Sequence, residues 1–135
     1  MAVIRVGVSF EPELLARFDE LIERKGYSSR SEAIRDLIRS ALIKDDVESG
    51  EGEVVGTITI LYRHDEGDVV ERLMHIQHHH HQEIKSTAHI HVDEHVCLEV
   101  LVVRGDGSHL RELADNLRAI KGVRYGDLVV ARPDI

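Results

Sequence analysis

Three side chains in the second half of the sequence have the types and the spacing of a transition-metal site. His89 and His91 are separated by one residue, and Cys97 follows shortly after them. In a strand, side chains at this spacing lie on the same face, and Cys97 would open the next strand of the same hairpin. Imidazole binds zinc, copper, iron and nickel, while thiolate favours the softer metals. The residues therefore predict a transition-metal site.

The identity of the metal stays open at this point. Zinc takes four tetrahedral ligands, but no zinc-finger spacing is present, whereas square-planar nitrogen and sulfur ligation suits nickel(II) or copper(II). A fourth ligand is missing from the hairpin, and His78 is a candidate. It opens a run of four histidines at 78–81 that follows an amphipathic pattern inside the chain, unlike a terminal tag. If this helix end lies at a subunit interface, His78 would come from another subunit. The alternative is that the histidines are surface residues and Cys97 a small buried hydrophobe.

The N-terminal residues predict a strand followed by two helices. Residues 3–10 alternate, with Ile4, Val6, Val8 and Phe10 on one face. A helix is expected from Pro12 to the stop at Gly26. A capping-box pattern at 29–32 opens a second helix. A lone strand has no partner for its backbone groups, so this unit is expected to dimerise by pairing two strands antiparallel.

Beyond a polar segment at 44–52, interpreted as a linker, the pattern changes. The expected order is βαββαβ, the ferredoxin-like arrangement. We expect strands at 54–62, 87–92, 96–103 and 123–131, and helices at 68–79 and 108–121. The fold class is thus α+β, with a ribbon-helix-helix domain at 1–48 and a ferredoxin-like, ACT-type domain at 53–135.

A ribbon of two antiparallel strands fits the major groove of double-stranded DNA. Arg5 and Ser9 would face outward, with Gly7 between them offering only its backbone to a base. The start of the second helix, at Ser29 and Arg30, offers free N–H groups to a phosphate. The net charge of −8 argues against a general affinity for nucleic acid, so a local patch would have to bind.

These motifs resemble those of the nickel-responsive repressor family (NikR) over nearly the whole chain. The resemblance rests on Gln77–His81, His89-Ile90-His91, His95–Glu99 and Ser31–Asp36. It implies a square-planar site with one Ni²⁺ per subunit, whose ligands are His89, His91 and Cys97 of one subunit and His78 of a neighbour. It also implies a homotetramer, a dimer of dimers, that binds a palindromic operator and represses nickel-uptake genes.

The resemblance further implies a secondary cation site for an ion such as K⁺. Its carboxylates would be Glu32 and Asp36, one turn apart on a helix. Its other ligands would be backbone carbonyls near residues 118, 120 and 123. The alternative is a solvated helix face. The acidic loop at 65–68, where relatives can carry basic residues, argues against a DNA contact there.

Other classes of protein fit less well. A metal chaperone or store would not need the N-terminal pattern, and an antitoxin would not need a second patterned domain. No nucleophile–base or phosphate-loop motif indicates an enzyme. The chain lacks a secretory pattern and any apolar run long enough for a bilayer, so we expect a cytoplasmic protein without membrane contact.

Overall fold

The computed structural model describes residues 2–49 and 52–135 and divides the chain into two compact units, Met1–Ser40 and Ala41–Ile135. Among the described residues, no helix combines the length and the apolar composition that crossing a membrane requires.

The first helix, α1 (Pro12–Lys25), begins and ends where the sequence predicts. Proline is tolerated at the start because the missing N–H has no helical partner there. At the other end Gly26 adopts a φ of 77°, and its N–H donates to the Glu23 carbonyl. The N–H of Tyr27 donates to the Ile22 carbonyl at 3.1 Å. This left-handed turn satisfies the last carbonyls of the helix.

The second helix, α2 (Arg30–Ser49), opens with the predicted cap. The N–H of Glu32 donates to Ser29 Oγ at 3.1 Å. The linker predicted at 44–52 is wrong for Lys44–Ser49, which remain helical. Tertiary contacts hold this last part, because Asp46 pairs with Arg132 and Val47 is buried beside Gly107. The rest of the predicted linker includes Gly50 and Glu51, which lie outside the described residues.

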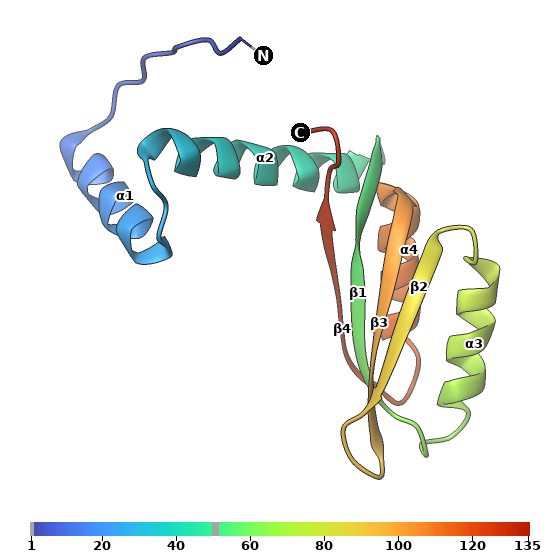
Figure 1. Ribbon diagram of the computed structural model, residues 1–135. Helices are drawn as coiled ribbons and strands as arrows, with labels where there is room; N and C mark the ends of the chain where they lie inside the picture. Colours follow the sequence, from blue (N-terminus) through green and yellow to red (C-terminus); the bar gives the residue numbers. More distant parts are fainter. Residues whose placement is uncertain (1, 50–51) are drawn as a thin grey trace. The chain divides into compact units, whose positions relative to one another are not determined.

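Residues 2–11 have no regular secondary structure, so the strand predicted at 3–10 is not formed in the single chain. A strand needs a neighbour for its backbone groups, and the described residues of this chain provide none to this segment. The apolar side chains expected on its inner face are correspondingly exposed, with Ile4 at 90%. Figure 1 shows the segment running free of the helices that follow it.

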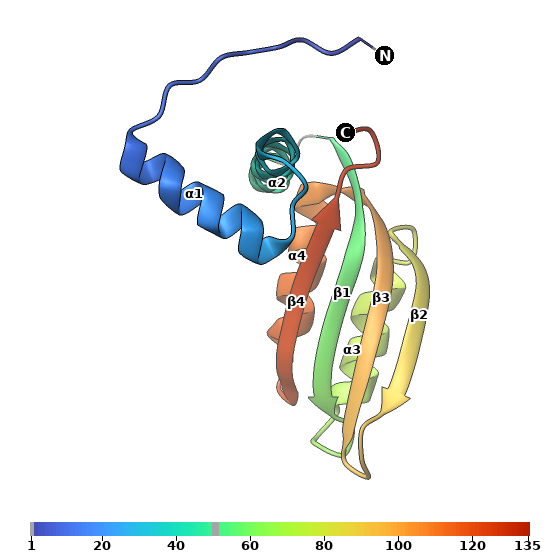
Figure 2. The same cartoon turned by 60° about the vertical axis from the view of Figure 1, so that its left-hand side comes forward.

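The second unit is a four-stranded antiparallel sheet with helices α3 (Val69–His79) and α4 (Gly107–Arg118) on one face (Figures 1 and 2). The strand order is β2-β3-β1-β4. The strands are β1 (Glu53–Arg63), β2 (Ile84–His91), β3 (Val96–Asp106) and β4 (Val123–Ala131). This confirms the predicted βαββαβ order, the ferredoxin-like arrangement.

Three boundaries differ from the prediction by about three residues, and one of them is the end of α4, which lies at Arg118 rather than at 121. Strand β2 begins at Ile84 rather than near 87, and β3 continues to Asp106 rather than ending near 103. The extension of β3 brings Asp106 to the start of α4, where its carboxylate accepts from the N–H of Ser108 at 3.0 Å. The core lies between sheet and helices. Its fully buried members include Val54, Ile58, Ile60, Val69, Leu101, Val103, Leu110, Leu113 and Leu117.

Gly56 is a position in β1 where the backbone of the neighbouring strand leaves no room for a side chain. A Cβ built there would lie 2.2 Å from the Val129 carbonyl oxygen and 3.0 Å from the Val130 Cα. We therefore expect Gly56→Ala to push β4 away from β1 and to lower the free energy of unfolding by about 1–3 kcal/mol. Urea denaturation of the metal-free protein measures this. Gly7→Ala is the matched control, because nothing lies within 4 Å of its Cβ. Equal unfolding midpoints for the two variants would refute the clash.

Candidate metal centre

The β2–β3 hairpin brings the predicted hairpin ligands onto one face of the sheet. In the register of the two strands His91 lies opposite Cys97, and His89 lies opposite Glu99. Cys97 Sγ is 3.4 Å from His91 Nδ1. The imidazole rings of His89 and His91 have centroids 5.2 Å apart. The hairpin therefore presents one buried thiol and two exposed imidazoles close together.

A further histidine, His64, forms a group of possible metal ligands with His91 and Cys97; among the described residues this group does not include His89, and the sequence did not predict His64 as a ligand. The ligand atoms of His64, His91 and Cys97 all lie within 4.8 Å of one another. His64 follows the end of β1, and its position depends on the pairing of Tyr62 with Cys97. The useful signal would have been that residues two apart share a face, which places His64 with Tyr62 once β1 and β3 are known to be neighbours.

Burial controls the chemistry of the thiol. Desolvation raises the pKa of Cys97, the neighbouring hydroxyl of Tyr62 lowers it, and the nearby carboxylates of Glu99 and Asp93 raise it. Without a bound cation the thiol is therefore held in its neutral form. A divalent ion reverses this balance, because a coordinating thiol is deprotonated. The donor set of one thiol and adjacent imidazoles fits a nickel ion.

A partly buried polar network connects helix α3 to the hairpin. Gln77 Nε2 donates to Glu99 Oε1 at 2.7 Å, and the hydroxyl of Tyr62 donates to Glu99 Oε2 at 3.3 Å. The same hydroxyl lies 3.2 Å from His89 Nε2. Burial and then the charge of Glu99 raise the pKa of Tyr62. The network fixes the side chain of Gln77, the residue before His78, relative to the imidazole of His89.

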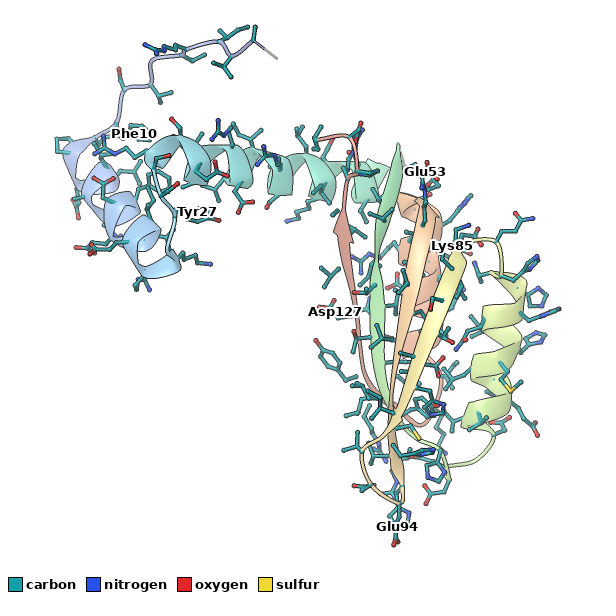
Figure 3. The ribbon with its side chains drawn as sticks, viewed as in Figure 1. Phe10, Tyr27, Glu53, Lys85, Glu94 and Asp127 are labelled. Carbon is teal, nitrogen blue, oxygen red and sulfur yellow. The ribbon has the colours of Figure 1, made fainter. Side chains whose placement is uncertain are left out.

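The group of possible metal ligands among the described residues contains His64, His91 and Cys97 but not His78. His78 lies in the last turn of α3, and the loop that follows is tied to the start of β2, since the N–H of Ile84 donates to the His80 carbonyl. His91 is the last residue of β2. A strand rises about 3.3 Å per residue, so the two ends of β2 are about 23 Å apart. In Figure 3, Lys85 and Glu94 mark these opposite ends.

The predicted DNA-contacting residues lie in the first unit. Arg5, Gly7 and Ser9 are exposed in the segment without regular structure. Ser29 caps α2, as described above. The guanidinium of Arg30 forms two hydrogen bonds to the Asp19 carboxylate, at 2.9 and 2.8 Å. A phosphate would therefore share Arg30 with Asp19.

The two carboxylates predicted for a secondary cation already have partners in this unit. Glu32 pairs with Arg35 at 2.6 Å. Asp36 accepts a hydrogen bond from the Tyr27 hydroxyl, and this bond raises the pKa of Tyr27. A cation at these carboxylates would compete with both interactions.

Comparisons with known proteins agree with this division of the chain. The model of the NikR C terminal nickel binding domain matches residues 55–131. The model of ribbon-helix-helix proteins of the copG family matches residues 4–45. A solved structure of an uncharacterised protein from Thermotoga maritima covers 58% of this chain and 98% of its own, with a TM-score of 0.54. Its 21% identity supports a shared fold alone.

Curated relatives match over nearly their full length. A protein of Thermococcus kodakarensis named "Putative nickel-responsive regulator" is 52% identical, covering 96% of this chain and 94% of the relative. A protein of the same name from Geobacter metallireducens is 51% identical, covering 94% and 91%. A DNA-binding ribbon-helix-helix domain joined to a metal-binding domain defines a metal-responsive transcription regulator. The chain belongs to the nickel-responsive regulator family.

This membership confirms the predicted family and fold class. The protein is a nickel-responsive regulator with a ribbon-helix-helix DNA-binding domain and a nickel-binding domain, and it is not an enzyme.

The polar network gives a prediction about stability. Tyr62→Phe removes the hydroxyl that donates to Glu99, whose side chain is buried with 8% exposure. In the variant, Glu99 keeps only the hydrogen bond from Gln77. Leaving a buried acceptor partly unsatisfied costs about 1–3 kcal/mol, so the free energy of unfolding should fall by that amount in metal-free urea denaturation. Tyr125→Phe is the control, because Tyr125 is exposed and its change should stay within about 0.5 kcal/mol. A similar loss in both variants would show that the network does not stabilise the fold.

Proposed function

We propose that this protein is a cytoplasmic, nickel-dependent repressor of nickel-uptake genes, acting as a homotetramer on a palindromic operator. Residues 1–48 bind DNA, and residues 53–135 bind nickel and form the tetramer. The observation that supports the proposal most directly is that the candidate nickel ligands lie at two opposite ends of the β2–β3 hairpin. Two imidazoles and a thiol meet at one end of the β2–β3 hairpin, while His78 lies in the helix turn tied to the other end.

The proposed nickel ligands are His89, His91 and Cys97 of one subunit and His78 of a neighbour, with one ion per subunit. When bound, the ion would link two subunits. The chain's own part is to hold the hairpin donors in register and to keep water from the thiol, which is fully buried. The contact of the Tyr62 hydroxyl with His89 Nε2 orients that ring, as groups around metal sites commonly do.

Exposed apolar surface supports assembly of the first unit as a dimer. Leu14, Leu37 and Ile38 are about half exposed, although helical spacing places them on the inner faces of α1 and α2. The apolar residues of the N-terminal segment are also open to solvent. Pairing with a second copy would bury both sets and supply strand partners for residues 3–10. The second unit would join two such dimers.

In that dimer the outward side chains of the ribbon would read the operator. Arg5 can form two hydrogen bonds to a guanine, and Ser9 can form one to a purine or a pyrimidine. Gly7 has no side chain and allows the ribbon backbone to approach the bases closely. Ser29 and Arg30, at the start of α2, would position the ribbon through a phosphate. Glu32 and Asp36 would hold a second cation such as K⁺, exchanging their present partners Arg35 and Tyr27 for it.

Control of DNA binding follows from the shared site. A neighbour's His78 can join the hairpin donors only when the end of α3 is ordered, so the metal-bound tetramer has fewer conformations. The ribbon-helix-helix dimers then populate more often the orientations in which they reach both half-sites of the operator. Nickel binding and operator binding would thus favour each other.

Removing the thiol tests the nickel ligands. Cys97→Ala should abolish the sulfur-to-nickel charge-transfer absorption and lower nickel affinity strongly, because the sequence contains one cysteine. Absorption spectroscopy during a nickel titration measures both. Stoichiometric binding with an unchanged spectrum would show that the ligand assignment is wrong.

Removing the guanidinium at the ribbon tests DNA recognition. Arg5→Ala should weaken operator binding by about 1–3 kcal/mol, or roughly 5- to 150-fold, while nickel affinity stays the same. Arg111→Ala, which removes a charge from α4, is the control. The measurement is a pair of titrations at fixed salt, one with operator DNA and one with nickel. If Arg5→Ala binds the operator as tightly as wild type, the ribbon is not the recognition element. If wild type binds the operator equally well after a chelator has removed nickel, DNA binding does not depend on nickel.

A further inference from the structure

Helix α3 carries a second pair of imidazoles that the proposed nickel site does not use. His75 and His79 are one helical turn apart, and both are exposed. Their ring centroids lie 4.6 Å apart with the ring planes at 81°. Among the residues that the structure describes, neither ring hydrogen-bonds to another group, so the ring nitrogens remain available to a ligand.

This pair has the chemistry of a two-point metal chelate. Imidazole nitrogen is a ligand for nickel, copper and zinc. Residues at i and i+4 of a helix face the same side, so one ion can bind both rings without unwinding the backbone. Once the first nitrogen binds, the second is held nearby at a high effective concentration. Glu71 lies one turn earlier on the same face and is also exposed, and water can fill the remaining positions.

We propose that His75 and His79 chelate a second divalent transition-metal ion, such as nickel, on the exposed face of α3. The ion would join the last two turns of the helix and hold residues 75–79 in helical conformation. His78 lies within this segment. Ordering of α3 by the second ion would therefore lower the entropic cost of placing His78 in a neighbour's site. This coupling rests on the proposed function, whereas the chelate itself does not.

Nickel titration of the full-length protein, followed by calorimetry and absorption, tests the chelate. Wild type should bind one ion per chain in a weaker class that adds no thiolate charge-transfer absorption. His75→Ala and His79→Ala should each lose that ion, with its affinity reduced about tenfold or more, since a single imidazole remains. The double variant should be no weaker than either single variant, because the two rings act as one ligand.

Two further variants separate this proposal from the main nickel site. His109→Ala removes an exposed histidine from α4 and should keep the weaker ion. Cys97→Ala should lose the charge-transfer band but should still bind the weaker ion. If Cys97→Ala leaves the band unchanged, the main ligand assignment fails while the α3 chelate stands. If His75→Ala and His79→Ala bind as many ions as wild type with the same affinities, the chelate is refuted.

Hydrogen exchange then tests the effect on the helix. In the Cys97→Ala protein, nickel should slow exchange of the α3 amides near residue 79, and it should not do so in the Cys97→Ala, His75→Ala double variant. Equal slowing in both proteins would show that the ion does not act through this pair.

Discussion

The pairing of His91 with Cys97 across the β2–β3 hairpin is the constraint on which the candidate metal centre depends. It places an imidazole nitrogen 3.4 Å from a buried sulfur. The hairpin cannot bend to bring its other end closer, because β3 is paired with β1 along its whole length. The end of α3 is tied to that other end. One chain therefore offers an incomplete donor set for a four-coordinate site that includes His78.

The N-terminal unit is incomplete in the same physical sense. Its strand-forming residues have no neighbour among the described residues, and apolar side chains of α1 and α2 remain half exposed. Both units would gain from a second copy, the first through burial and strand pairing and the second through coordination. In the proposed tetramer these needs are met together, which gives the metal a means of influencing the arms. The Gln77–Glu99–Tyr62–His89 network adds a rigid connection between α3 and the hairpin.

Local patterns made most of the fold predictable. Pro12, Gly26 and the Ser29–Glu32 cap determine where the first helices begin and end, and all three act through neighbouring backbone groups. The linker prediction failed at Lys44–Ser49 because polar residues there are held in a helix by the tertiary partners of Asp46 and Val47. Such contacts join residues far apart in sequence and leave no periodic signal. The strand predicted at 3–10 is not formed in the single chain, because no described residue offers partners to its backbone groups.

The candidate site was predictable where it is local and missed where it is not. His89, His91 and Cys97 share one hairpin, so alternation along a strand was enough to group them. His64 was missed because it joins the cluster through the pairing of β1 with β3, which a single sequence does not reveal. The hydrogen-bonding partners Tyr62, Gln77 and Glu99 were missed for the same reason, because they come from three different elements.

The claim that each nickel site is shared between subunits can be tested most directly by mixing two defective proteins. His78→Ala lacks the neighbour's ligand and Cys97→Ala lacks the thiol, so neither alone should develop normal charge-transfer absorption with nickel. When the two are co-expressed or refolded together, His78 from a Cys97→Ala subunit can complete the site of a His78→Ala subunit. If nickel is shared between subunits in this way, the absorption band should return in part in the mixture. No recovery in mixed tetramers verified by mass spectrometry would contradict a shared site.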